Sequence, residues 1–366
     1  MPRPTSDSPS IPSPILTRSA DMKSRAVTIG AALLAVTIAT TACQTKKSSA
    51  SGAASDDVTI MVGGAAKVIY LPAKLTEQLG YFKDQGLNVK LVDTPAGVTA
   101  ETALIANQAQ GVVGFYDHTI DMQAKGKCLT GVVQFANVPG EVEMVATNKA
   151  AAIGSPSDFK GKKLGVTSAG SSTDFLTQYL AGKAGVSTAD YTTVKAGADS
   201  TFIAALNSGG IDAGMTTDPT VAKLTTSGDG KILLDMRTEA GTRKALGGLY
   251  PASSLYMSCD YVASHPQTVQ KLANAFVKTL KFIKGNEAAA IADKMPADYA
   301  GSDKSLYVKA ISDSKAMFNE TGVMNPEGAK NVLEVLGSFS PAVKPKKSSI
   351  DVSKTYTTKF AQAAQS

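Results

Sequence analysis

The strongest constraint on the fold is an alternation of short apolar runs with segments of helical periodicity, which occurs in two successive series. Such an alternation is typical of β–α–β units, in which helices cover a largely parallel sheet. With 366 residues, 43% of them hydrophobic, the chain is long enough for two such sheets. The expected strands are 58–62, 87–92, 111–115 and 128–135 in the first series, and 163–167, 192–195, 211–215 and 231–236 in the second.

Two further strands are expected outside these series. Segment 141–147 alternates like an exposed strand between the series, and segment 255–261 is a strand candidate after them. The residues Ser264-His265-Pro266-Gln267 have the form of a capping box with proline in the first turn, so a long helix is predicted to start here. Additional helices are expected near 304–318 and 326–336.

The N-terminus predicts export from the cytoplasm. Lys23 and Arg25 precede an apolar stretch at 27–38, which is too short to span a bilayer and is followed by small residues, as in a signal peptide. The first 21 residues add nothing to such a signal, so translation begins at either Met1 or Met22.

The expected signal peptide, residues 1–43, ends in Thr40-Thr41-Ala42-Cys43, which resembles the lipobox of bacterial lipoproteins. Thr40 departs from the aliphatic residue usual there. We expect Cys43 to be lipidated, since acyl chains would anchor the protein to a membrane; the alternative is plain secretion, with Cys43 an incidental residue. The polar segment 44–57 then predicts a flexible tether.

Charge and cysteine content narrow the possible partners. The formal net charge is +6, but the lysines are scattered and no basic stripe with interleaved aromatic residues is present, so we expect no nucleic-acid partner. Two cysteines remain in the folded region, Cys128 and Cys259. Because an exported protein meets oxidising conditions, they form either a disulfide or two buried thiols.

Candidate ligand-binding residues follow the strands of the first series, because ligands bind beyond the carboxyl ends of open α/β sheets. The small residues at 63–65 either let a ligand approach the backbone or form an ordinary turn. Tyr116 could stack on a ligand, whereas Asp117 could bind an amine or hydroxyl or simply cap the next helix. A metal site at His118 is not expected, because too few ligands surround it. These candidates are Gly63, Gly64, Ala65, Tyr116, Asp117 and His118.

The second series places a serine-rich loop after its first strand. Free N–H groups and the helix macrodipole favour an anion at such a helix start, although the hydroxyls could serve only their own helix. After the strand that ends at 215, the Asp-Pro pair could again be a simple cap. The candidates here are Ser168, Gly170, Ser171, Ser172 and Thr173 in the loop, and Met215, Thr216 and Asp218 after the later strand.

Known catalytic motifs are missing from this loop. A phosphate loop needs a lysine after its glycines, but the lysines here precede the strand and none follows Gly170. No G-x-G-x-x-G or G-x-S-x-G motif occurs in the stretch, and no pattern of histidine and acid predicts a catalytic triad. We therefore expect no enzymatic activity and no cofactor.

Four stretches resemble the substrate-binding proteins of ABC importers, in the group for nitrate, sulfonates, taurine and thiamine precursors. They are "LGYFKDQGLNVKLV", "DFKGKKLGVTSAGSSTDFLTQYLAGKAGV", "STFIAALNSGGIDAGMTTDP" and "DYVASHPQTVQKLANAFVKTLKFI", and the resemblance covers roughly 58–284. Thiamine-pyrimidine synthases have a similar fold, but their cysteine-rich motif is missing here. None of the stretches identifies the ligand.

The resemblance implies a two-lobe fold of the type II periplasmic-binding-protein class, with a ligand clamped between the lobes. Hinge strands are then expected near 141–147 and 250–261. The first lobe would comprise 58–140 and 255–345, and the second lobe 148–249. The expected partners are a membrane permease with a separate ATPase subunit, and the expected oligomeric state is a monomer.

The ligand class stays open at this point. A sulfonate or nitrate suits the serine loop, yet Asp117 would repel a bare anion and no arginine stands in the loops named above. A zwitterion, or a neutral thiamine pyrimidine precursor stacked on Tyr116, would relieve that conflict. A subunit that presents its ligand to a sensor would have the same fold and cleft.

Overall fold

The computed structural model describes residues 56–365. The expected signal peptide, the lipidation site at Cys43 and most of the expected tether lie outside these residues, so these assignments stay predictions. Strand β1 begins at Asp56, so the last two residues of the expected tether belong to the first sheet.

The first sheet has five strands in the order β2-β1-β3-β10-β4. Strand β1 pairs in parallel with β2 and β3, whereas β10 runs antiparallel between β3 and β4. One strand therefore runs against the other four, as expected for a mainly parallel sheet. The strands are β1 (Asp56–Val62), β2 (Leu87–Asp93), β3 (Gly111–Phe115), β4 (Leu129–Gln134) and β10 (Ser253–Ser258).

The second sheet repeats this pattern in the order β7-β6-β8-β5-β9. Strand β6 pairs in parallel with β7 and β8, and β5 runs antiparallel between β8 and β9. We refer to the two sheets with their covering helices as the first and the second lobe; the exact division of the chain between them stays a prediction. The strands are β5 (Glu141–Ala146), β6 (Lys163–Val166), β7 (Thr192–Lys195), β8 (Ala213–Thr217) and β9 (Gly230–Asp235).

The expectation that segment 141–147 forms an exposed strand is wrong, because all six residues of β5 are buried. Val142 and Met144 pack into one apolar cluster, and Val145 packs into another. The intervening Glu143 is buried as well, and its burial raises the pKa of the carboxyl to about 8. The sequence of β5 alternates between acidic and apolar residues, as in a strand with one face in water. Here both faces are covered, so the acidic side chains are buried as well.

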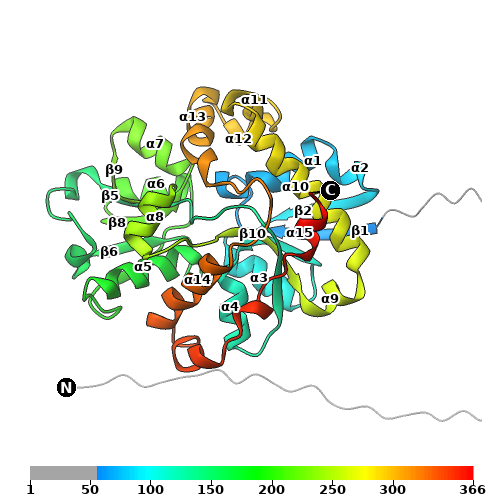
Figure 1. Cartoon of the computed structure of the whole chain (residues 1–366). Helices are drawn as coiled ribbons and strands as arrows, with labels where there is room; N and C mark the ends of the chain where they lie inside the picture. Colours follow the sequence, from blue (N-terminus) through cyan, green and yellow to red (C-terminus); the bar gives the residue numbers. More distant parts are fainter. Residues whose placement is uncertain (1–55, 366) are drawn as a thin grey trace, which may run out of the picture. The chain divides into compact units, whose positions relative to one another are not determined.

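Helices cover both sheets, and the largest is α10, which lies beside the first sheet (Figure 1). Its apolar residues recur at helical spacing, and Phe276 contacts Phe82 and Phe135 with ring centroids 5.2 and 4.9 Å apart. None of the helices within residues 56–365 combines the length and apolar character of a membrane span. The helices are α1 (Leu71–Gln78), α2 (Tyr81–Asp84), α3 (Gly97–Ile105), α4 (Asp117–Ala124), α5 (Ser172–Lys183), α6 (Ser200–Asn207), α7 (Thr220–Ser227), α8 (Glu239–Leu246), α9 (Cys259–Ser264), α10 (Pro266–Gly285), α11 (Ala288–Ala292), α12 (Ala297–Ala300), α13 (Lys304–Ser314), α14 (Pro326–Phe339) and α15 (Lys359–Ala363).

The junction between β10 and α10 differs from the prediction. The strand ends at Ser258, whose hydroxyl accepts a hydrogen bond from the N–H of Tyr261 and so caps α9. Ser264 ends α9 and donates its hydroxyl to the carbonyl of Asp260 at 2.7 Å, so it takes no part in a capping box. Proline does occupy the first turn of α10, as the sequence predicts.

Cys128 and Cys259 are joined by a disulfide whose Cα atoms lie 5.5 Å apart. Cys128 directly precedes β4 and Cys259 directly follows β10, so the bridge closes the end of a strand pair that is 131 residues apart in sequence. The N–H of Cys259 also donates to the carbonyl of Cys128 at 3.1 Å.

Replacing both Cys128 and Cys259 with serine is expected to lower the free energy of unfolding by about 2–5 kcal/mol, because the unfolded chain is no longer constrained by a long closed loop. Urea denaturation followed by circular dichroism measures the change. A reductant should lower the stability of the wild-type protein and leave the double variant unaffected. Equal stability of the oxidised wild type and the double variant would contradict the prediction.

Candidate functional site

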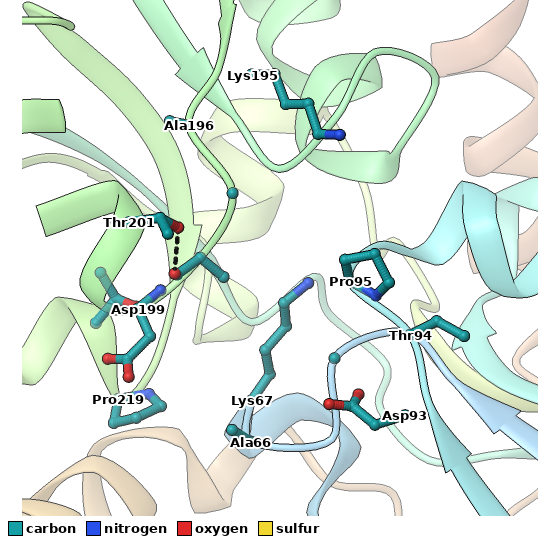
Figure 2. A pocket seen from close by; sticks show the side chains of 14 residues that line it. Ala66, Lys67, Asp93, Thr94, Pro95, Lys195, Ala196, Asp199, Thr201 and Pro219 are labelled. Carbon is teal, nitrogen blue, oxygen red and sulfur yellow. Dashed lines mark hydrogen bonds between the residues drawn. The ribbon is translucent and has the colours of Figure 1, made fainter. Parts of the chain in front are cut away.

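A cavity of about 460 Å³ lies where loops of the two lobes meet (Figure 2). The loops after β1 and β2 form one wall, and the loops after β7 and β8 form the other. The cavity therefore lies beyond the carboxyl ends of strands from both sheets, where open α/β sheets bind their ligands. Its lining residues lie within 64–67, 93–95, 195–201 and 219–220.

Lys67 carries the charge that reaches into this cavity. Figure 2 shows its side chain in the space between Pro95 on one side and Asp199 on the other, and its Nζ donates to the carbonyl of Gly63 at 3.0 Å. Burial lowers the pKa of Lys67 to about 8, although the charges of Glu141 and Asp93 oppose this shift. A desolvated ammonium of this kind favours an anionic partner.

Small apolar side chains line much of the remaining wall. Ala66 and Pro95 belong to the first lobe, and Ala196, Ala198 and Pro219 to the second. These side chains offer no hydrogen bonds, so they suit the hydrocarbon part of a solute.

The two carboxylates at the cavity already have protein partners. Asp93 accepts a hydrogen bond from the N–H of Ala65 at 2.7 Å, and Asp199 lies 2.5 Å from the ammonium of Lys223. Asp199 has a left-handed backbone with φ of 50°, and its N–H donates to the hydroxyl of Thr220 at 3.0 Å. These bonds hold the loops that form the walls and leave two lysines at the cavity, the partly buried Lys67 and the exposed Lys195.

Asp117 joins the two lobes at a second point. Its buried carboxylate accepts hydrogen bonds from the hydroxyls of Ser172 and Tyr250, each at 2.9 Å. Asp117 begins α4 of the first lobe and Ser172 begins α5 of the second, so one of these bonds crosses between the lobes. Burial raises the pKa of Asp117, whereas the charge of His118 and these two hydrogen bonds act in the opposite direction.

Asp218 makes a third connection, through its backbone. Its carbonyl accepts from the N–H of Val68 at 2.9 Å, which links the second lobe to the first. The carboxylate of Asp218 accepts from Arg237 at 2.9 Å, from Ser314 at 2.7 Å and from the N–H of Ala222 at 3.0 Å. With these three partners, the carboxylate of Asp218 holds neighbouring segments of the protein together.

This chain matches the protein-family model described as NMT1/THI5 like over residues 70–290. It belongs to that family. A solved structure from Bordetella bronchiseptica RB50 is 35% identical, and the match covers 84% of this chain and 96% of the other with a TM-score of 0.81. No curated protein sequence matches the chain.

Two further solved structures share the fold of this chain at lower identity. The alkanesulfonate-binding protein SsuA from Xanthomonas axonopodis pv. citri, bound to MOPS, is 19% identical over 82% of this chain and 98% of its own, with a TM-score of 0.66. The periplasmic nitrate-binding protein NrtA from Synechocystis PCC 6803 is 13% identical over 85% and 88%, with a TM-score of 0.65. These similarities confirm the predicted two-lobe, type II periplasmic-binding-protein fold.

Of the predicted ligand-binding residues in the first lobe, those at 63–65 lie at or beside the cavity, whereas Tyr116 is buried away from it. Gly64 lines the cavity, Gly63 accepts the bond from Lys67, and Ala65 donates to Asp93. The ring of Tyr116 is buried against Tyr356, at a centroid distance of 6.2 Å. The hydroxyl of Tyr116 forms a hydrogen bond with that of Thr355, so its geometry does not favour stacking on a ligand.

Most polar groups of the serine loop bond within the protein. Ser172 donates to Asp117, Thr173 accepts from the N–H of Thr167 at 3.0 Å, and Gly170 donates to Asp174 at 2.9 Å. Ser171 is the N-cap of α5, but its hydroxyl makes no capping bond and is buried without a hydrogen-bond partner among the described residues. The simple capping interpretation therefore does not account for Ser171. Ser168 is partly buried, and its carbonyl accepts from the N–H of Ser171 at 3.1 Å.

The remaining predicted ligand-binding residues, Met215, Thr216 and Asp218, are buried in the protein. Met215 and Thr216 are buried within β8, where they pair with Glu143 and Val142 of β5. Asp218 serves the anchoring role described above. Within residues 56–365, no group of three or more His, Cys, Asp or Glu side chains is arranged to hold a metal ion.

Sequence reasoning missed Lys67, Glu141 and Tyr250. Lys67 follows the Gly63-Gly64 turn by only a few residues, which was the available signal for a charge at this edge of the sheet. Glu141 is buried, and burial followed by the charge of Asp117 raises its pKa well above the usual value, against the opposing charge of Lys67. Only the fold brings Tyr250 and Glu141 together with Asp117, and Lys67 together with Glu141.

Replacing Ser172 with alanine is expected to lower the free energy of unfolding by about 1–3 kcal/mol, because a buried oxygen of Asp117 loses its partner. The same change should shift the protein toward a more open cleft, which small-angle X-ray scattering detects as a larger radius of gyration. Tyr250→Phe is the matched control, since it removes the other bond to Asp117 but none to α5. A radius of gyration that stays at the wild-type value in Ser172→Ala would contradict the role of this bond in closure.

Proposed function

We propose that this protein is the solute-binding component of an ABC importer and that it captures a small organic sulfonate in the cavity between its lobes. The ammonium of Lys67 carries this proposal, because it projects into a cavity whose walls come from both sheets. The similarity to sulfonate- and nitrate-binding proteins supports the transport role.

The size and lining of the cavity favour an organic anion over nitrate. A volume of about 460 Å³ falls in the range of sites for small organic ligands and far exceeds the need of a four-atom ion. The small apolar wall of alanine and proline side chains suits a hydrocarbon chain attached to the charged group.

The buried carboxylates behind the cavity do not oppose this assignment. Both oxygens of Asp117 accept hydrogen bonds from hydroxyl groups, which spread its charge. The raised pKa of Glu141 favours its uncharged form. Lys67 supplies the cation that the predicted loops seemed to lack, so an anion at Lys67 is compatible with Asp117 nearby.

Binding from both walls would favour the closed arrangement of the lobes. A solute that touches the first lobe through Lys67 and the second through loop 195–201 has more contacts when the lobes are closed. This difference in contacts shifts the population toward closure. The closed form would then be the form that a membrane permease recognises, while a separate ATPase subunit supplies the energy.

We further propose that the protein acts outside the cytoplasm as a monomer, anchored to the membrane through Cys43. Mass spectrometry of the N-terminal peptide distinguishes a lipidated Cys43 from a secreted, unmodified chain. Comparing solute uptake with solute-dependent signalling in a deletion strain separates import from sensing.

A thermal-shift screen tests the ligand class, since a true ligand raises the melting temperature by mass action. The panel should contain alkanesulfonates, taurine, nitrate, and pyrimidine precursors of thiamine. Stabilisation by alkanesulfonates supports the proposal. Stabilisation only by an uncharged pyrimidine would replace it with the alternative of a heterocycle-binding protein.

Lys67→Met is expected to weaken alkanesulfonate binding about 10- to 100-fold, because a charge-assisted hydrogen bond contributes roughly 1.5–3 kcal/mol. Isothermal titration calorimetry measures the loss. Lys195→Met is the matched control, because Lys195 lies on the opposite wall but is exposed to solvent, so its removal should cost less. An equal loss in the two variants would argue against Lys67 as the main anion contact.

The affinity for a sulfonate should also fall as the pH rises through about 8, the value to which burial lowers the pKa of Lys67. Below this pH the ammonium is charged and holds the anion; above it the amine is neutral. The sulfonate keeps its charge throughout, so the change reports on the protein. Titrations at pH 6.5 and 9.5 test this, and the affinity of Lys67→Met should change much less with pH than that of the wild type.

A further inference from the structure

A second lysine, Lys195, lines the cavity from the second lobe. Lys195 is the last residue of β7 and pairs in the sheet with Val166, whose carbonyl accepts from the N–H of Ala196 at 2.9 Å. The sheet therefore fixes the backbone here and leaves the side chain exposed. Figure 2 shows this side chain extending away from Ala196 toward the side of the view on which Pro95 lies. Among residues 56–365, no group forms a hydrogen bond or ion pair with its ammonium.

The carboxylates at the cavity do not neutralise Lys195. Asp199 is paired with the ammonium of Lys223 at 2.5 Å. Asp93 accepts a hydrogen bond from a backbone N–H, and its charge acts on Lys67 of the same wall. Each carboxylate thus has a partner of its own, so in the described part of the chain the second-lobe wall carries one ammonium without a counter-charge.

Lys67 on the opposite wall is held in place by the loop that carries it. Its Nζ donates to the carbonyl of Gly63, and its stem packs over Gly64, where an added Cβ atom would lie 2.7 Å from Cε of Lys67. Two of its three N–H groups remain for a solute. The cavity therefore has a positioned cation on the first lobe and a free cation on the second, and alanine and proline side chains line the space between these walls.

The free ammonium of Lys195 limits what the far end of the solute can be. A solute that fills the cavity displaces water from both lysines. A hydrocarbon end would remove hydration from the ammonium and return nothing, whereas an anionic end would replace the water with a charge-assisted hydrogen bond. Closure of the lobes also brings two like charges toward each other, and an anionic group at each lysine offsets this repulsion.

We propose that Lys195 is a second anion-binding group of the cavity and that the solute is an organic dianion, with a sulfonate at Lys67 and a carboxylate at Lys195. This proposal rests on the proposed function, because it concerns the same cavity and the same sulfonate. The short chain between the two charged groups lies against the apolar side chains of the walls.

The exposure of the two lysines determines which anion binds to which. A sulfonate spreads its charge over three oxygens and is less strongly hydrated than a carboxylate, so it loses less when it moves to the partly buried Lys67. The carboxylate keeps part of its hydration at the exposed Lys195.

Pairs of sulfonates that differ only in the charge of the far end test the proposal. Sulfoacetate, 3-sulfopropanoate and 4-sulfobutanoate cover three spacings of the charged groups, and the corresponding carboxamides have nearly the same shape without the second charge. We expect at least one carboxylate to bind about three- to fivefold more tightly than its amide in isothermal titration calorimetry. This gain is the upper part of the range for exposed ion pairs, because the walls exclude part of the water.

Three variants locate the gain. Lys195→Met should abolish the preference for the carboxylate over its amide, whereas Lys67→Met should weaken both compounds by a similar factor and keep the preference. Lys231→Met is the matched control, because it removes the same charge from an exposed position on β9 that does not line the cavity. Equal losses of preference in Lys195→Met and Lys231→Met would indicate a general field of the lobe and overturn the assignment to Lys195.

The remaining outcomes overturn either this proposal alone or the proposed function with it. If the amides bind in a Lys67-dependent way but no carboxylate binds more tightly than its amide, the cavity takes a sulfonate and the role of Lys195 is wrong. If 3-aminopropane-1-sulfonate binds more tightly than every carboxylate, the second group of the solute is a cation, and the dianion is wrong. If none of the compounds binds, amides included, both proposals fail.

Discussion

The carboxylate of Asp117 is the constraint on which the arrangement of the two lobes depends. A buried carboxylate is tolerated only when hydrogen bonds replace its lost hydration, and Ser172 and Tyr250 supply one bond to each oxygen. Because Ser172 belongs to α5 of the second lobe, this compensation exists only when the lobes are in contact. Opening the cleft would therefore return part of Asp117 to water, and the difference in free energy between open and closed forms is expected to be small enough for a solute to decide it.

The charged groups of the cleft are arranged in layers. Lys67 lies at the cavity, whereas Glu141 and Asp117 lie behind it in fully buried positions. Burial acts in opposite directions on the two kinds of group, since it lowers the pKa of the lysine and raises the pKa of both carboxyls. Each pKa therefore shifts toward favouring the neutral form of the group, and an anion bound at Lys67 would raise the pKa of that lysine again.

The sequence predicts the two sheets well because strand and helix periods are local properties. It predicts the loops of the site only in part, because the partners of each side chain lie far away in the chain. Tyr116 looks like a free aromatic residue, but Thr355 and Tyr356 cover it from more than 200 residues away. The alternation in β5 looks like a half-exposed strand, yet β8 and β9 flank it and bury both of its acidic residues. Asp218 does cap α7, since its carboxylate accepts from the N–H of Ala222, but it also binds Arg237 and Ser314 on distant segments. The partners of Asp117 are distant side chains only, Ser172 and Tyr250.

Gly63 and Gly97 allow the loops at this edge of the first sheet to pack closely together. Any side chain at Gly63 would press on the backbone of Gly97, and any side chain at Gly97 would press on the imidazole of His118. The close approach lets the loop after β1, the start of α3 and the start of α4 converge, and it encloses the buried imidazole of His118 behind the backbone of Gly97. A cation that binds an anion is common in clefts of this kind, and by itself it distinguishes little between one sulfonate and another. Discrimination between sulfonates would then depend on how well the alanine and proline side chains of the cavity fit the rest of the solute.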